Sequence, residues 1–214
     1  MTYHLSHLPA VQAAIAAAAA CNTLDDLAEA ITSFKEHDLC SSSPMPSRAG
    51  ESCPKESPVM LLGKSPAWTE HETKVPFSGP AGQVLREEMK AIGRDVEDCW
   101  ISCASPWKAK KNNPNATLLA IARPFLFREI ELVQPRVIIA LGQKADEALT
   151  QKAEKVTDKV GKAWTFIAPN GFEVPVYTNW CHAAVMYDPR LAPEFKNVLT
   201  TAFNGEQDAQ RRAA

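Results

Sequence analysis

The sequence lacks the cysteine spacing that is typical of a metal ribbon. It holds six cysteines in 214 residues, and none of them forms a C-x-x-C pair. Without such pairs neither a zinc ribbon nor a disulfide framework is indicated. We therefore expect reduced thiols and no bound metal. The cysteines are Cys21, Cys40, Cys53, Cys99, Cys103 and Cys181.

Long hydrophobic runs are missing as well. The longest apolar run extends from Ala13 to Cys21, which is shorter than the roughly 20 residues that a membrane-spanning helix needs. The basic residues that precede the apolar core of a secretory signal peptide are absent. We expect a cytoplasmic protein with no membrane contact.

An excess of charge of one sign is also absent. The chain has 23 Lys and Arg against 25 Asp and Glu, which gives a net charge of −2. A nucleic-acid partner would therefore need a local basic patch. The composition, 45% hydrophobic and 22% charged, is that of an ordinary globular protein. The length fits a single domain with a substantial core.

One stretch near the middle of the chain combines a buried strand with two turns. Val59 to Leu62 is a continuous apolar run that ends at Gly63, and the turn Lys64-Ser65-Pro66 follows. A second Gly/Pro cluster at 79–82 opens a helical segment at 83–92. A strand, a glycine-containing turn and a helix start form a concave site that suits phosphate or a polar ring. An ordinary strand-to-helix connection fits the same residues.

The remaining segments alternate between strands and helices. Residues 1–38 are expected to form an N-terminal helical segment, followed by a loop at 40–58. Strands are expected at 99–104, 137–142 and 174–180, and helices at 115–130, 143–150 and 193–203. A hairpin or irregular excursion is expected at 151–174. This order predicts an α/β fold with a mainly parallel sheet over 39–204 and a disordered tail at 205–214.

Three of the predicted strands end in residues that can carry chemistry. These strand ends are Gly63 to Pro66, Ser102 with Cys103, and Cys181 with His182. Ligands of open α/β sheets bind beyond the carboxyl ends of the strands. Parallel topology therefore predicts that these three segments share one rim.

The motifs, taken in order, resemble the uracil-DNA glycosylase superfamily, most closely the family-four type. The similarity covers roughly residues 23–203. It rests on Gly63-x-x-Pro66, on Pro76-Phe77-x-Gly79-x-Ala81-Gly82, on Ala91-Ile92-Gly93-Arg94, on the segment from Pro124 through Glu129 and Val133 to Ile138, on Leu141-Gly142, and on His182 followed by Asp188-Pro189-Arg190-Leu191.

The resemblance implies a three-layer α/β/α sandwich with a central four-stranded, mainly parallel sheet. It also implies a monomeric enzyme that flips a base out of DNA and hydrolyses its glycosidic bond. In that case His182 donates to the O2 of the leaving base, Phe77 stacks on the base, and Ser65 positions water. Base contacts are then expected from Lys64, Ala67, Phe77, Ser102 and Cys103. DNA contacts are expected from Pro66, Gly79, Lys108, Lys110, Lys111, Ala183, Val185, Met186 and Tyr187, where 183–187 matches a wedge loop.

Several positions depart from the family pattern. The four cysteines that hold an iron–sulfur cluster in family-four enzymes correspond here to Phe34, His37, Trp107 and Ala122, so we expect no cluster and no cofactor. In the active-site turn, Lys64 replaces a glutamate and Ala67 replaces a glycine. Cys103 stands where relatives have a base-reading asparagine. The Pro-Ser after the histidine is Ala183-Ala184.

Two explanations of these departures are open. The chain can excise a different base, such as a pyrimidine with a C5 substituent, for example from heavily modified viral DNA. Alternatively, hydrolysis is lost and the fold serves as a DNA-binding or base-modifying module. A more remote alternative is an enzyme of small-molecule nucleotides. The individual residues also have simpler interpretations. His182 can be a half-buried histidine, Phe77 a core residue and Cys103 a small buried thiol, and the loop with Lys108, Lys110 and Lys111 can be a solvated turn.

Overall fold

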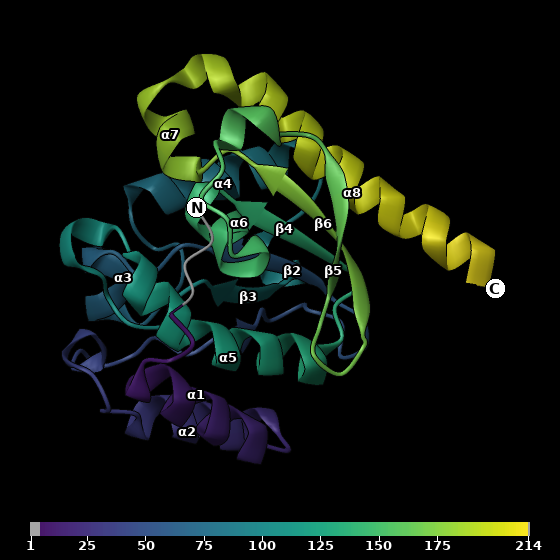
Figure 1. Cartoon of the computed structure of the whole chain (residues 1–214). Helices are drawn as coiled ribbons and strands as arrows, with labels where there is room; N and C mark the ends of the chain where they lie inside the picture. Colours follow the sequence, from purple (N-terminus) through teal and green to yellow (C-terminus); the bar gives the residue numbers. More distant parts are fainter. Residues whose placement is uncertain (1–4, 214) are drawn as a thin grey trace.

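A computed structural model describes the backbone of residues 5–213 and the side chains of residues 5–205. Residues 1–4 of the expected N-terminal segment and residue 214 of the expected tail lie outside the described residues. A twisted sheet forms the centre of the molecule, with helices on both sides (Figure 1). None of the described helices is long and apolar enough to cross a membrane.

The sheet has the order β1-β3-β2-β4-β6-β5. Its four inner strands are mutually parallel, as the sequence predicts, and each edge strand pairs antiparallel with its neighbour. The hairpin of β5 and β6 accounts for part of the excursion expected at 151–174. The strands are β1 (Arg48–Ala49), β2 (Val59–Gly63), β3 (Trp100–Cys103), β4 (Val137–Leu141), β5 (Ala163–Ile167) and β6 (Glu173–Asn179).

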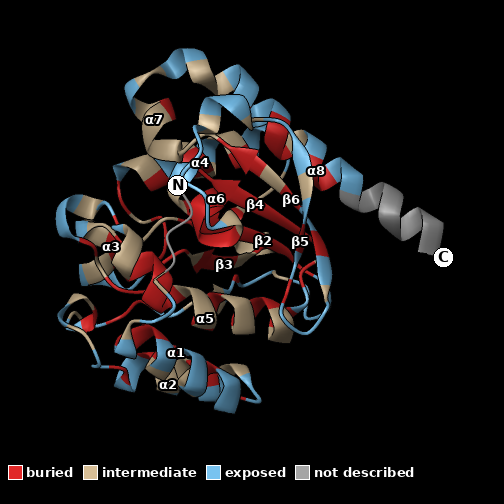
Figure 2. Ribbon diagram, in the orientation of Figure 1, coloured by how far each residue is buried: buried red, intermediate tan, exposed pale blue. Residues whose placement is uncertain are grey.

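The central strands are apolar throughout because both of their faces are covered. Every residue of β2 and β4 is buried, and Figure 2 shows these strands as the most continuous buried part of the ribbon. Alternate residues of β2 point to opposite sides. Leu61 packs with α4 and α8, whereas Met60 and Leu62 pack with α5 and α6. The expected three-layer α/β/α sandwich is confirmed. The described sheet has six strands and not the expected four, because β1 and β5 each add an antiparallel strand at an edge.

The helices have the bounds that follow from local capping and packing. The helix α5 begins after Asn115, whose side chain accepts from the N–H of Leu118, and α2 begins with a capping box at Thr23 and Asp26. The helices are α1 (Pro9–Ala20), α2 (Leu24–Ser33), α3 (Trp68–Thr73), α4 (Pro80–Ala91), α5 (Ala116–Val133), α6 (Gln143–Thr150), α7 (His182–Tyr187) and α8 (Ala192–Ala213).

The structure adds elements that the sequence analysis missed. The strand β1 lies within the expected loop at 40–58, where it pairs with β3. The short helix α3 occupies the chain between the two turns of the central stretch. The segment 183–187, expected as a loop, is part of α7. The helix α8 continues to Ala213, through residues expected to form a loose tail.

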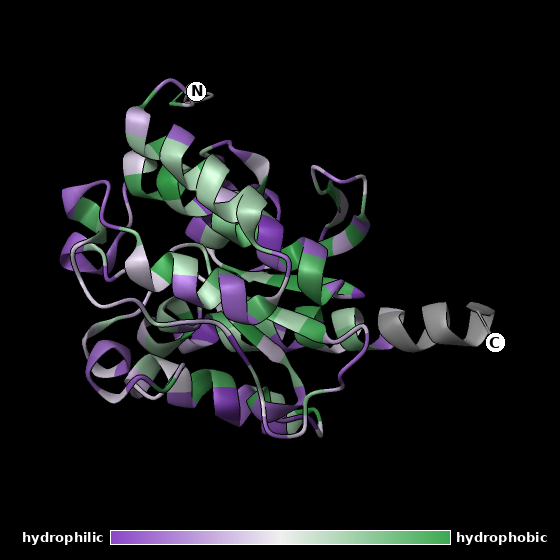
Figure 3. Ribbon diagram, turned by 90° about the horizontal axis from the view of Figure 1, so that it is seen from below, coloured by the Kyte–Doolittle hydropathy of each residue, from purple (hydrophilic) through white to green (hydrophobic). Residues whose placement is uncertain are grey.

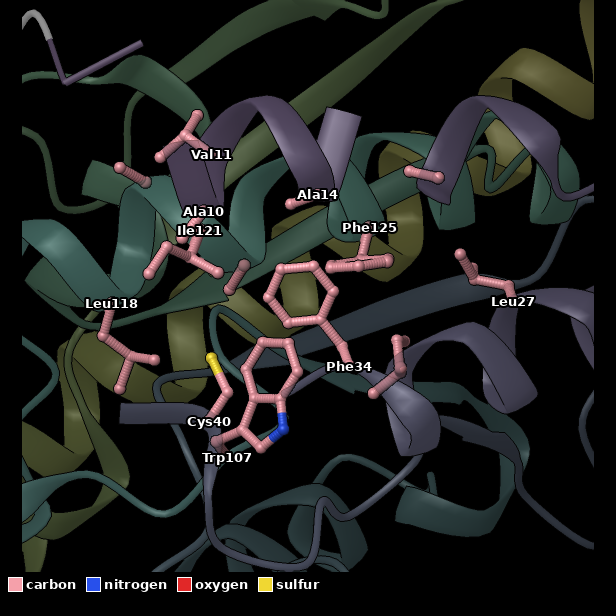
Figure 4. Packing of buried hydrophobic residues seen from close by; sticks show 14 of the residues in the cluster. Ala10, Val11, Ala14, Leu27, Phe34, Cys40, Trp107, Leu118, Ile121 and Phe125 are labelled. Carbon is pink, nitrogen blue, oxygen red and sulfur yellow. The ribbon is translucent and has the colours of Figure 1, made fainter. Parts of the chain in front are cut away.

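The N-terminal helices form an outer layer against α5. The alanine-rich α1 packs on α5, and Figure 3 shows largely hydrophobic colouring along the helices beside the N-terminus. Under this layer the rings of Phe34, Trp107 and Phe125 pack together, with centroids 5.3 to 6.0 Å apart (Figure 4). Trp107 is completely buried.

Two of these aromatic residues, Phe34 and Trp107, are at positions that the resemblance assigns to cluster cysteines, together with His37 and Ala122. Phe34, Trp107 and Ala122 are buried and carry neither a thiolate nor an imidazole, and the Nδ1 of His37 accepts from the N–H of Leu39 at 3.1 Å. Iron–sulfur clusters need thiolate or, less often, imidazole ligands. The residues at these four positions do not fit a cluster. Among the described residues, no group of three or more His, Cys, Asp or Glu side chains is arranged to hold a metal ion.

Replacing Trp107 with alanine is expected to reduce the free energy of unfolding by about 3–5 kcal/mol, because truncating a fully buried tryptophan leaves a cavity. Urea unfolding followed by circular dichroism measures the change. The matched control is Ile167→Ala, since Ile167 is 60% exposed. Equal stability of the Trp107 variant and the control would contradict the assigned role of the aromatic core.

Candidate active site

A cavity of about 490 Å³ lies at the carboxyl ends of the inner strands, a size typical of small-ligand sites. All three segments that the sequence analysis singled out line it: the turn after β2, the end of β3, and the start of α7. Of the predicted site residues, those lining the cavity are Lys64, Ser65, Pro66, Ala67, Phe77, Ser102, Cys103, Lys111, His182, Ala183, Met186 and Tyr187.

The rings of Phe77 and His182 meet inside this cavity. Their centroids lie 5.1 Å apart, and the rings are perpendicular, an arrangement favoured by aromatic pairs. Phe77 has a φ of +54°, a left-handed conformation that is strained for a bulky residue. Gly82 is required beside it, because a Cβ there would lie 2.1 Å from the Phe77 carbonyl oxygen. The local backbone therefore fixes the phenylalanine ring against the histidine.

A second close approach positions His182. The backbone N–H of Gly142, at the end of β4, donates to the carbonyl of Asn179 at the end of β6. A Cβ on Gly142 would lie 2.7 Å from the Cβ of Cys181, and its φ is +95°. Glycine at this position leaves room for Cys181, the residue that directly precedes α7, to lie against the end of β4. His182 is thereby placed at the rim formed by the strand ends.

The environment of His182 favours a neutral imidazole. Burial, followed by the positive charge of Lys64, lowers the pKa of His182 to about 4. At neutral pH the ring then carries one N–H donor and no net charge. Its Nδ1 is buried and has no hydrogen-bond partner among the described residues. The side chain can therefore donate to a ligand without bringing a cation into the cavity.

The turn and α3 contribute further polar atoms. The hydroxyl of Ser65 is buried and has no partner in the described part of the chain. One carboxylate oxygen of Glu70 accepts from the N–H of Gly79 at 3.1 Å, while the other has no partner there. Glu70 lines the cavity, and the sequence analysis missed it because nothing in a polar six-residue helix indicates which side chain turns inward.

A buried carboxylate supports the end of β3. Glu129 accepts from the Ser102 hydroxyl at 2.9 Å and from the Trp100 indole N–H at 2.6 Å. Burial nevertheless raises the pKa of Glu129 to about 7. Burial, and secondarily the charge of Glu129, raise the pKa of the Cys103 thiol. At the cavity wall, Cys103 is therefore a neutral thiol, and the hydroxyl of Ser102 already donates its hydrogen bond to Glu129.

Some of the predicted DNA-contact residues lie at the cavity, and others do not. Lys111 and the exposed Tyr187 line the cavity, and Lys108 lies beside it with its ammonium 4.1 Å from the ring centroid of Trp68. Lys110 is exposed but does not line the cavity, and the N–H of Gly79 is already bonded to Glu70. The assignment of Val185 as a wedge is wrong, because the helix α7 turns this side chain into the core, where it is 3% exposed.

Replacing Lys64 with glutamine is expected to raise the pKa of His182 from its value near 4, because removing a nearby cation makes protonation easier. Burial, the larger cause, remains, so the pKa should stay below the ordinary value of about 6.5. A pH titration of the imidazole resonances by NMR measures the pKa of His182 in the unmodified protein and in the Lys64 variant. An ordinary midpoint in the unmodified protein would contradict the neutral imidazole.

Comparison with known proteins identifies the family. Residues 49–199 match the family model described as the uracil DNA glycosylase superfamily. A type-4 uracil-DNA glycosylase of Pyrobaculum aerophilum is 33% identical over 155 residues, which cover 70% of this chain and 79% of that enzyme. The type-4 uracil-DNA glycosylase of Archaeoglobus fulgidus is 26% identical over 182 residues, covering 82% of this chain and 89% of its own.

Proposed function

The chain belongs to the uracil-DNA glycosylase superfamily, and we propose that it is a DNA glycosylase that hydrolyses the N-glycosyl bond of an everted pyrimidine. The observation that carries this proposal is the perpendicular contact of Phe77 and a neutral His182 within one cavity at the strand ends. The names of the relatives, type-4 uracil-DNA glycosylases, support it.

In the proposed reaction the base lies against Phe77, and its bond to the sugar breaks with both electrons leaving on the base. The neutral His182 donates a hydrogen bond to the O2 atom, where negative charge develops. This hydrogen bond is stronger in the transition state than in the ground state, because the charge on O2 is larger there. Only such a difference in strength lowers the barrier. A water oxygen then bonds to C1′ of the sugar, and an abasic site remains.

Ser65 and Glu70 are assigned to the water. Their buried oxygens without partners among the described residues lie on the turn and on α3, two adjoining walls of the cavity. Glu70 is the one carboxylate among the described residues that line it. We assign Glu70 to accept the proton that the water loses, and Ser65 to orient the water by hydrogen bonding. The proton then passes to the departed base, which completes the hydrolysis.

The finer proposal concerns the base. Lys64 brings a long cationic donor to the cavity, and Cys103 brings a small neutral thiol to the wall. A thiol is a poor partner for the polar edge of uracil, whereas a lysine can donate to a polar C5 substituent. We infer a preference for a C5-substituted pyrimidine over plain uracil. Heavily modified viral DNA is a source of such bases.

His182→Ala is expected to reduce base excision by about 10²–10³-fold, because one donor to the developing anion is lost. The protein is incubated with DNA that carries uracil, 5-hydroxymethyluracil or a glycosylated pyrimidine. Alkali then cleaves the strand at abasic sites. The control is His7→Ala, which removes an exposed histidine away from the cavity.

The same assay separates the competing functions. Faster excision of a substituted pyrimidine than of uracil supports the proposed base preference. Faster excision of uracil contradicts that preference and still supports a glycosylase. Tight DNA binding without abasic sites on any substrate would instead indicate a binding or base-modifying module. Excision that persists unchanged in the His182 variant would contradict the assigned mechanism.

A further inference from the structure

Trp68 is an exposed aromatic side chain at the mouth of the cavity. It is the first residue of α3, directly after Ala67 of the active-site turn, and it lines the cavity while being 64% exposed. Exposed tryptophans are uncommon, since burying a ring of this size is strongly favourable. Trp68 is not part of any of the three hydrophobic core clusters, so packing in the core does not explain why a tryptophan stands here.

A lysine lies over this ring. The ammonium of Lys108 is 4.1 Å from the centroid of the Trp68 ring, well within the range of a cation–π contact. Two features hold this lysine in place. Trp107, the preceding residue, is completely buried in the aromatic core, and the backbone N–H of Lys108 donates to the Ser42 hydroxyl at 3.2 Å. The cation is therefore carried on a fixed segment.

A flat exposed ring beside a cation fits one class of ligand. Proteins that bind single-stranded nucleic acid stack bases on aromatic rings and contact the phosphates with basic side chains. Lys111, on the same loop as Lys108, adds a second cation at the cavity wall. An acidic peptide would be attracted by the lysines, but it would not need the indole.

We propose that Trp68 and Lys108 bind the nucleotide next to the everted one, with its base stacked on the indole and its phosphate at the ammonium, and that this selects single-stranded DNA. The inference rests on the proposed function, because it assumes that the everted base occupies the cavity. In a duplex the neighbouring base is paired and stacked, so freeing its face costs a few kcal/mol. In a single strand that face is already available.

The test compares Trp68→Ala and Trp68→Phe with the unmodified protein. Fluorescence anisotropy measures binding to a labelled oligothymidine with one central uracil, as a single strand and in a duplex. Trp68→Ala should weaken single-strand binding by about 5- to 150-fold, the equivalent of losing one base stack, and leave duplex binding nearly unchanged. Trp68→Phe should restore most of the affinity. Ile167→Ala, which removes another exposed apolar side chain, should change neither.

The outcomes separate this inference from the proposed function. Unchanged single-strand binding of Trp68→Ala overturns the inference, and so does an equal loss on both DNA forms. Neither result bears on whether the unmodified protein excises a base, which the alkali assay measures separately. If the unmodified protein binds single strands through Trp68 but forms no abasic sites, the binding site stands and the glycosylase fails. Thermal melting of each variant confirms that it is folded before binding is compared.

Discussion

The site depends on the contact between Phe77 and His182. The two rings come from distant parts of the chain, and each is fixed by a glycine that lets backbone approach closely: Gly82 for Phe77 and Gly142 for the start of α7. The contact also shields the imidazole from water and so contributes to the desolvation that keeps it neutral. The neutral state of the imidazole therefore follows first from this packing and second from the positive charge of Lys64.

The aromatic core connects the N-terminal helices to this site. Phe34 comes from the end of α2, Trp107 from the loop after β3, and Phe125 from α5. Their packing occupies the region where family-four relatives are expected to hold a cluster, and it fixes the loop on which Lys108 and Lys111 lie. The same packing that stabilises the outer helical layer therefore positions the basic rim beside the cavity.

Much of the fold could be predicted from the sequence because the signals are local. The uninterrupted apolar runs of β2 and β4 indicate strands buried on both faces, and the parallel order follows from the alternating helices. The strand-end rule and the motif spacing place His182, Phe77 and Ser65 in one region, and the cavity includes all three.

The remaining features depend on tertiary contacts. Val185 is buried because α7 is a helix that packs on α4, whereas its sequence reads equally well as a loop. The two-residue strand β1 exists only through its pairing with β3. The exposure of Trp68 and the inward turn of Glu70 follow from the path of α3, which no apolar period predicts.

The most direct test is a crystal structure of the protein bound to single-stranded DNA that carries a non-hydrolysable pyrimidine nucleotide. The account predicts that the base lies against Phe77 within the cavity, with its O2 about 2.6–3.2 Å from a nitrogen of His182. A base that binds outside the cavity, or one whose O2 faces away from the imidazole, would contradict it.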